Sequence, residues 1–525
     1  MSPKSPTPLL LLLQEQLAAA RAYDTEILAH NAEGQTMLVP GIGKNISTAY
    51  EQLRKSAESV EEYLLLQRAI RRFYNRTVAF SSPKKPSGVG GELVLELTHA
   101  GYLANESVST GTATTITRLT QEYVEVYKKL GHARVPRDVR LAWVLDLLTV
   151  ETEALLNPHY KLTAIAYVAF QHYLSSFPRE KFVTSDEEDN QYEMCLYVAV
   201  HQALLKSDIA TVRYNLGRIY RQSSGKLGAF IDFNRSVDRA FSSRLTQKLK
   251  QLVNRYGAPF RIVRSLCDDR DDVPELLGNQ EVFLQAYDQQ MLKEYRSVAM
   301  RLKRGIIKSI VFIFITKVSV GLAIEIPYDI LVHGSVAILP LAVNLLFPPL
   351  YMASFGLGLR PPSRANAEAL HIYIDQVLYT GKTPIDHTIR VRTKPMSAFA
   401  KLVYTLFLFV PLSMMVYVLM LLHFNVVQGF IFFVFLSTAS YLGFRLSRMS
   451  RELELLERQT KLSGAVRDFF YLPFIVMGQW ISSKYARLNL VAYILDILVE
   501  LPLKTVLRLV RQWVRFLNEK HEEMY

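Results

Sequence analysis

Residues 402–444 read LVYTLFLFVPLSMMVYVLMLLHFNVVQGFIFFVFLSTASYLGF and contain no Asp, Glu, Lys or Arg. As one helix this stretch would be about 64 Å long at 1.5 Å per residue, whereas about 20 apolar residues cross the ~30 Å hydrocarbon core of a bilayer. The stretch therefore predicts two membrane-spanning helices. The turn between them is expected between His423 and Gly429, where polar residues and a glycine interrupt the apolar run.

Two further apolar runs precede this stretch. Residues 333–357 contain no Asp, Glu, Lys or Arg, and residues 309–324 contain a single charged side chain, Lys317. A soluble protein that buries these segments as core helices is a poor alternative, because core helices rarely lack charged residues over stretches as long as 333–357 or 402–444. The sequence therefore predicts an all-α integral membrane protein with four spans, at about 306–324, 334–356, 401–422 and 427–445.

The basic residues predict how these spans are oriented. They gather before the first span, between the second and third spans, and after the fourth span, whereas the other two loops contain no Lys or Arg. Loops rich in Lys and Arg remain on the cytoplasmic side. We therefore expect both termini and the loop 358–400 to be cytoplasmic, in a plasma or inner membrane.

The net charge of the 525-residue chain is +13, which calls for an anionic partner. Basic side chains beside a span attract anionic lipid headgroups, and Arg301, Lys303 and Arg304 are placed to do so. No RNA-binding, zinc-finger or recognition-helix pattern is present, so nucleic acid is not expected as a partner. The two cysteines have no metal-ligand spacing, and they fit a reducing compartment.

Helical periodicity dominates the first 300 residues, with strand-like alternation only at Glu92–Leu97. The apolar face of 281–304 enters the first span without a proline, so we expect one continuous helix there. The predicted division is an N-terminal helical segment (1–80), a Pro/Gly/Ser-rich linker (81–91), a cytoplasmic helical domain (92–304), the transmembrane region (305–445) and a tail (446–525).

Polar residues inside the apolar runs are the first candidates for a functional site, because such residues cost free energy in a bilayer and usually pair or face water. They are Lys317, Glu325 and Asn344. Glu325 follows Lys317 by eight residues, about 12 Å along a helix, which predicts that it is too distant for a direct ion pair. A carboxylate partner for Lys317 is therefore expected from elsewhere in the chain.

The C-terminal region could supply that partner. Residues 469–483 are uncharged, too short for a span and typical of an interfacial or re-entrant segment. Residues 488–517 form an amphipathic pattern that fits a helix on the cytoplasmic leaflet, with headgroup contacts from Arg508, Arg511 and Arg515. Alternatively, a re-entrant hairpin over 469–503 would bring Asp496 or Glu500 towards Lys317.

One acidic cluster deserves a chemical interpretation. Asp268, Asp269 and Asp272 lie in the run DDRDD, whose spacing resembles the DDxxD motif of all-α prenyl and terpene synthases. That resemblance covers five residues, and it implies carboxylates that hold Mg²⁺ against a diphosphate. The sequence lacks the second acidic motif of that family. The alternative is a solvated loop in which Asp272 caps a helix that begins near Pro274.

No sequence motif for catalysis or cofactor binding appears, and we expect no cofactor. The leading hypothesis is a non-enzymatic membrane scaffold whose cytoplasmic helical domain recruits a protein partner. The alternatives are an ion- or proton-coupled transporter that uses the polar residues of the spans, and a Mg²⁺-dependent prenyl-diphosphate enzyme. The sequence leaves the oligomeric state open.

Overall fold

The computed structural model describes residues 6–32, 35–39, 63–77, 88–183, 185–220, 227–359, 361–382, 397–456 and 462–488. These residues form two compact units. The N-terminal unit contains the residues up to Val253 together with Arg270–Leu277, and the bundle unit contains Asn254–Asp269 and Gly278–Leu488. Helices account for the secondary structure of the described ranges, apart from one isolated β-bridge between Thr36 and Ser109. The all-α prediction is confirmed.

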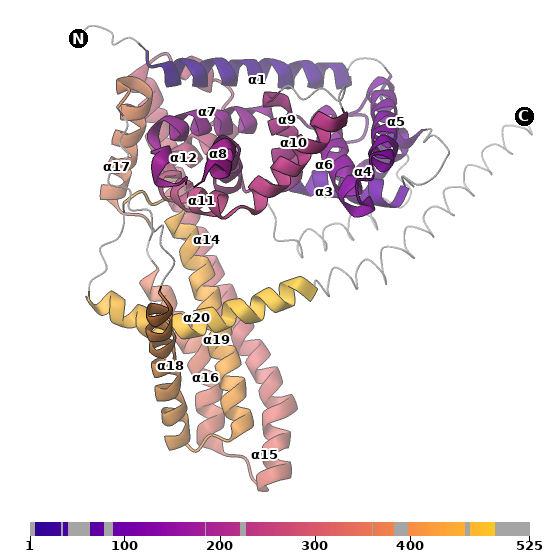
Figure 1. Ribbon diagram of the computed structural model, residues 1–525. Helices are drawn as coiled ribbons and strands as arrows, with labels where there is room; N and C mark the ends of the chain where they lie inside the picture. The colour runs from indigo at the N-terminus through magenta and orange to yellow at the C-terminus, as the bar shows by residue number, and fades with distance from the viewer. Residues whose placement is uncertain are drawn as a thin grey trace, which may run out of the picture. The chain divides into compact units, whose positions relative to one another are not determined.

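The N-terminal unit is a layered array of short helices (Figure 1). In chain order they are α1 (Pro8–Ala32), α3 (Tyr63–Thr77), α4 (Val89–His99), α5 (Thr110–His132), α6 (Arg137–Leu156), α7 (Tyr160–Ser176), η1 (Arg179–Lys181), α8 (Asp186–Val200), the π-helical η2 (His201–Leu205), α9 (Ile209–Ile219), α10 (Leu227–Ser242), α11 (Arg244–Tyr256) and α13 (Val273–Leu276).

The core of this unit forms where α3, α4, α5 and α6 pack together. Ile70, Leu93, Ile116 and Leu148 come from these four helices in turn, and all four side chains are completely buried. Their helices repeat apolar residues every three or four positions, which places those residues on one face. Beside this core, α1 lies along α7 (Figure 1).

The structure corrects one local prediction at the start of α4, because Val89–Gly91 belong to this helix and not to a linker. Glu92–Leu97, the stretch with brief strand-like alternation, are helical, in agreement with the all-α prediction. Gly90 packs directly on α5, since a Cβ atom there would lie 1.9 Å from the carbonyl oxygen of Ala113. The glycine therefore serves a close helix contact, which composition alone cannot distinguish from a flexible loop. Residues 81–87 lie outside the described residues.

The bundle unit contains the apolar helices. They are α12 (Ala258–Asp269), α14 (Gln280–Val320), the π-helical η3 (Gly321–Glu325), α15 (Ile326–His333), α16 (Ile338–Gly358), α17 (Arg364–Asp375), the π-helical η4 (Gln376–Thr380), α18 (Ala398–Leu421), α19 (Val426–Arg451) and α20 (Leu462–Leu488). The helix predicted to enter the first span without interruption is confirmed, because α14 continues unbroken past residue 304.

Three helices of the described chain are long and apolar enough to cross a membrane: Gln280–His333, Ile338–Gly358 and Val426–Arg451. A shorter apolar helix, Thr405–Leu421, lies within α18. The break between α18 and α19 falls at residues 422–425, which overlaps the first part of the stretch where the sequence predicts it. His423 adopts a positive φ of 58°, and Asn425 caps α19 through a reciprocal pair of hydrogen bonds with Gln428.

Glycines allow α14, α16 and α19 to approach closely. A Cβ atom at Gly356 of α16 would lie 2.8 Å from the Ile306 side chain of α14, and one at Gly443 of α19 would lie 2.6 Å from the Phe355 ring of α16. Small residues at such crossings are characteristic of helix packing in membranes, where close backbone approach replaces the hydrophobic driving force.

Polar contacts fasten a second set of helices to the first half of α14, and we call this set the collar (α12, α17 and residues 452–456). The Asn366 amide of α17 donates to the Tyr295 hydroxyl at 2.7 Å and to the Leu453 carbonyl at 2.8 Å. Arg261 of α12 donates to the Glu452 carbonyl at 2.6 Å. The predicted loop 358–400 therefore contains an ordered helix that is part of the collar.

The last described helix, α20, lies across α18 and α19 rather than alongside them (Figure 1). Its Gly478 sits against α19, because a Cβ atom there would lie 2.2 Å from the Ser437 carbonyl oxygen. Phe474 is buried between α18 and α19. Residues 469–488, the first part of the segment considered for a re-entrant hairpin, form one continuous stretch of this helix.

Candidate functional site: two buried polar clusters

Lys317 is buried and forms an ion pair with Glu325. This contact corrects the prediction that Glu325, eight positions after Lys317, is too distant for a direct ion pair in a continuous helix. In a regular helix, a residue eight positions after another lies about 80° from it around the helix axis. The π-helical η3 inserts one extra residue into the turn, so Glu325 takes the place of a seventh residue, about 20° from the same face. The long side chains then cover the remaining separation along the helix axis.

Asn344 of α16 and Gln428 of α19 join this pair to the neighbouring helices. The Asn344 amide donates to Glu325 Oε2 at 2.9 Å and to the Gln428 carbonyl at 3.3 Å. Both acceptors are oxygens, which fixes the orientation of the amide and leaves Asn344 Oδ1 buried without a hydrogen-bond partner. The Lys317 ammonium group also lies 4.9 Å from the centre of the Phe435 ring, within the range of a cation–π interaction.

Asp329, one helical turn after Glu325, is fully buried and accepts hydrogen bonds from neutral donors. Gln428 Nε2 and Asn425 Nδ2 each donate to its carboxylate at 2.8 Å. Ala337 N, at the start of α16, lies 3.5 Å from the same group. Asp329 thus faces the N-terminal ends of α16 and α19, whose helix dipoles favour a negative charge. We call these six residues the Lys317 cluster (Lys317, Glu325, Asp329, Asn344, Asn425 and Gln428).

The Lys317 cluster contains one cationic and two anionic side chains on a single helical stretch, linked to two further helices. Such an arrangement can serve two purposes. It can hold three helices in a fixed register, because breaking a buried pair leaves an uncompensated charge. It can also transfer a proton between Lys317 and Glu325, and the Asn344 Oδ1 atom is available there to accept a further hydrogen bond.

The other predicted residues of the apolar region have different environments. Arg301, Lys303 and Arg304 are exposed on α14, as a contact with headgroups requires. Asp496, Glu500, Arg508, Arg511 and Arg515 lie outside the described residues, so the structure does not address the predicted hairpin contact with Lys317.

The acidic run at 268–272 is engaged in ion pairs. Asp269 accepts from Lys293 at 2.5 Å, and Asp272 pairs with Arg270 at 2.6 Å. Asp268 lies 3.7 Å from Arg264. Asp272 occupies the predicted N-cap position of α13 but makes no side-chain cap bond. In the described part of the chain, no group of three His, Cys, Asp or Glu residues could hold a metal ion. These ion pairs favour a solvated, salt-bridged loop over a metal site, and the predicted side-chain cap by Asp272 is absent.

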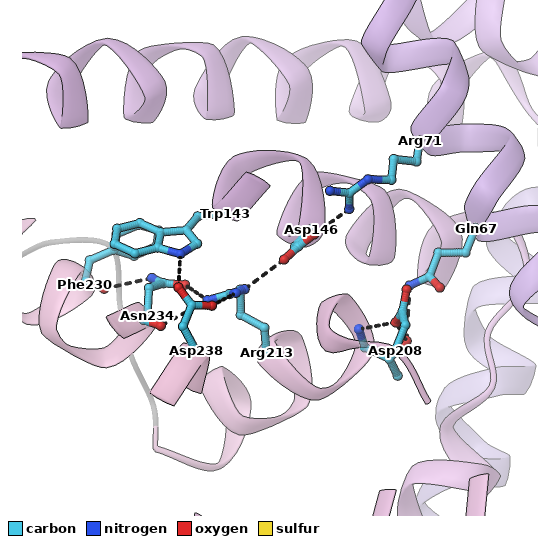
Figure 2. Close-up of polar contacts among 10 residues, drawn as sticks. Gln67, Arg71, Trp143, Asp146, Asp208, Arg213, Phe230, Asn234 and Asp238 are labelled. Carbon is cyan, nitrogen blue, oxygen red and sulfur yellow. Dashed lines mark hydrogen bonds and ion pairs between the residues drawn. The ribbon is translucent and has the colours of Figure 1, made fainter. Parts of the chain in front are cut away.

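A second buried cluster lies in the N-terminal unit, centred on Arg213 of α9 (Figure 2). Its guanidinium group donates to Asp146 at 3.0 Å, to Asp238 at 2.5 Å and to Asn234 at 2.8 Å. Trp143 Nε1 donates to the second oxygen of Asp238 at 2.8 Å. Together these contacts join α6, α9 and α10.

Asp146 of the Arg213 cluster also pairs with Arg71 of α3. Burial raises the pKa of Asp146, and the two arginines partly oppose that rise. Sequence reasoning missed this cluster, although a signal was present. Asp146 is the one charged residue within the apolar run Trp143–Leu148 of α6, and a lone acid on a buried face implies a buried cationic partner.

Comparisons with protein-family models, curated proteins and solved structures find no significant match for this chain. A function can therefore be inferred only from the residues and contacts of the protein itself.

Proposed function

We propose that the chain is an integral membrane protein with four spans. In this proposal α18 crosses the membrane in addition to the three long apolar helices. Large apolar side chains on the outer surface of the bundle support this proposal. Val311 and Phe312 of α14 and Phe407 and Phe409 of α18 are about half exposed. A soluble protein rarely leaves so large an apolar surface uncovered, whereas a bilayer covers it without cost.

The proposed orientation places both termini and the collar in the cytoplasm. Lys308 lies where the apolar part of α14 begins, Lys401 lies in the first turn of α18, and Arg445 lies in the last third of α19. The opposite end of the bundle carries the Asp329 hydrogen bonds and the residues 334–337, which include no Lys or Arg. Basic residues at one end of the bundle alone are the signature of a cytoplasmic face.

We place α20 at the cytoplasmic leaflet as an interfacial helix. Ser437 and Tyr441, which it contacts, precede Arg445 by eight and four residues, or about 12 and 6 Å along α19. The shallower of these depths lies within the roughly 5–10 Å to which interfacial helices bury their apolar face, and Phe474 reaches deeper to stack on Phe433. Trp480 is 62% exposed with Lys484 over its ring, a combination suited to an interface with headgroups.

For the molecular role we propose a non-enzymatic membrane scaffold whose cytoplasmic part recruits a protein partner. The observation that supports it most is the unbroken α14, whose first half holds the collar and whose second half belongs to the apolar bundle. Because the collar is fastened to that helix by Asn366 and Arg261, a partner bound on the cytoplasmic side would be held at a fixed place above the membrane.

Proximity labelling tests the scaffold role. A labelling enzyme fused to the N-terminus of the full-length protein should mark a reproducible partner that also co-purifies with the chain in detergent. The matched control carries the same enzyme in the loop 334–337, which is proposed to lie on the other side of the membrane. Identical labelling from both positions, or no protein that co-purifies, contradicts the scaffold proposal.

The Lys317 cluster favours a second candidate, proton- or ion-coupled transport. Its ion pair is buried, a helix is widened by a π-turn beside it, and Asn344 Oδ1 has no partner. In proteoliposomes, the wild-type protein should dissipate an imposed pH gradient faster than empty liposomes do. Lys317→Met/Glu325→Gln should abolish that activity, whereas Lys308→Gln, which alters an exposed lysine, should retain it. Equal rates with wild-type protein and empty liposomes rule out proton transport.

A further inference from the structure

A small polar cavity in the N-terminal unit lies apart from both clusters. Its volume is about 60 Å³, above the roughly 15 Å³ that a single water-sized guest requires. The cavity lies where α6, the start of α7, η2 and α9 meet, and we call it the Glu153 pocket. Its lining residues with polar side chains are Glu153, Asn157, His159, Tyr160, Thr163, Ser207, Thr211, Tyr214 and Asn215.

Glu153 is the anionic side chain among the residues that line this cavity. Its side chain is 7% exposed, and its Oε1 atom has no hydrogen-bond partner. Glu151, two residues earlier on α6, shows the usual solution, because its carboxylate accepts a 2.7 Å hydrogen bond from the Tyr123 hydroxyl. A buried carboxylate without such a partner must either hold a proton or face a cation.

No Lys or Arg is among the lining residues, and the Arg218 guanidinium lies over the Tyr160 ring, 4.7 Å from its centre, without a hydrogen bond to Glu153. Asp208 caps α9 through Thr211 and adds a second negative charge nearby. His159 lines the pocket, but burial lowers its pKa, so the imidazole is neutral at neutral pH. Burial and Asp208 both raise the pKa of Glu153 well above its usual value. Glu153 therefore has no cationic partner among the side chains that line the cavity.

The lining also limits the kind of guest. Apolar side chains (Val150, Ala154, Leu162 and Leu205) share the lining with residues that carry hydroxyl, amide and carboxylate oxygens, and such oxygens are ligands that hard cations prefer. Divalent ions usually bind to several carboxylates, whereas a single one lines this cavity. The small volume excludes larger organic amines.

We propose that the Glu153 pocket binds a small monovalent cation of the potassium or ammonium class, with the Glu153 carboxylate as its counter-ion and the surrounding hydroxyl and amide oxygens as ligands. This site is separate from the membrane region and adds a ligand to the proposed cytoplasmic unit. Bound cation would stabilise the meeting point of α6, α7 and α9.

Thermal unfolding of the full-length protein in detergent tests the proposal. At pH 8 and constant ionic strength, Tm is measured while choline chloride is replaced by KCl, NH₄Cl or NaCl. Tm should rise with K⁺ or NH₄⁺ and saturate, and at a concentration of 100 Kd the ratio of folded to unfolded protein should increase about 100-fold. The arm with the lowest saturating concentration identifies the cation.

Two variants locate the site. Glu153→Gln should lose the response to K⁺ and NH₄⁺ and should have a higher Tm than the wild type in choline chloride, because it removes the uncompensated charge. Glu151→Gln is the matched control on the same helix and should keep the full response. A wild-type Tm that is equal in all four salts overturns the proposal and shows that the pocket holds a proton or water only. An unchanged response in Glu153→Gln overturns it as well.

Discussion

At the scale of single residues, the Lys317–Glu325 pair is the most consequential contact of the bundle unit. Both side chains are at most 1% exposed. Paired charges of this kind contribute little net stability compared with apolar replacements, yet the removal of one partner is costly. The pair therefore fixes one arrangement of α14, α15 and α16 more than it strengthens the bundle.

A double-mutant cycle tests this interpretation. Lys317→Met alone should destabilise the protein by about 3–5 kcal/mol, because Glu325 remains buried and uncompensated. Lys317→Met/Glu325→Gln should recover most of that loss, which Tm values in detergent would show. Additive effects of the two substitutions would mean that the side chains do not interact.

His201 provides a test of acid sensitivity in the N-terminal unit. It is fully buried in η2, next to Tyr197 and within 3.3 Å of Ser207, and burial lowers its pKa to about 3. Between this value and the ordinary pKa of about 6.5 the unfolded chain binds a proton that the folded chain does not. The contribution to stability is thus complete above pH 6.5 and is lost as the pH falls.

When the pH is lowered from 7 to 5, the buried His201 should therefore decrease the free energy of unfolding by about 2 kcal/mol. His201→Gln should reduce the acid-induced decrease in Tm, whereas His132→Gln, which alters an exposed side chain, should leave it as in the wild type. An equal decrease in the wild type and in His201→Gln would show that this histidine does not limit acid stability.

At the scale of elements, glycines determine which helices can cross. Gly478 brings α20 against the backbone of α19, where a Cβ atom would lie 2.2 Å from a carbonyl oxygen that cannot rotate away. Gly429 of α19 has no atom within 4 Å of such a Cβ. Substitution by alanine should therefore be unfavourable at Gly478 and tolerated at Gly429.

Gly478→Ala should displace α20 and destabilise the protein by about 1–3 kcal/mol, as overpacking does in other cores. Gly429→Ala should be neutral or stabilising by up to about 1 kcal/mol, because alanine is the better helix former. Limited proteolysis at 457–461 and Tm in detergent provide the measurements. Equal Tm values for the two variants would argue against close packing of α20 on α19.

At the scale of the whole molecule, the proposed topology can be tested by cysteine labelling. The two native cysteines, Cys195 and Cys267, are buried, so their background reaction should be low. With a membrane-impermeant maleimide and intact cells, Ser335→Cys should react, because it lies in an exposed loop on the proposed outer side. Ser107→Cys should react only after permeabilisation. The reverse pattern would invert the topology.

Three features of this protein could be predicted from its amino-acid sequence: the fold class, the continuous entry of α14 into the apolar region and the approximate position of the turn between α18 and α19. These features depend on local chemistry, namely uncharged runs, helical periodicity and the polar interruption around Asn425. Such signals lie within one segment of chain, and their meaning does not depend on which helices become neighbours.

The partners of the buried polar residues, in contrast, depend on how the helices pack. The pairing of Lys317 with Glu325 requires a π-turn, which no propensity rule predicts. The Arg213 cluster and the Glu153 pocket each combine residues from helices far apart in the sequence. Their chemistry arises when chain packing removes water from particular side chains, and a linear pattern contains no information on which side chains then face one another.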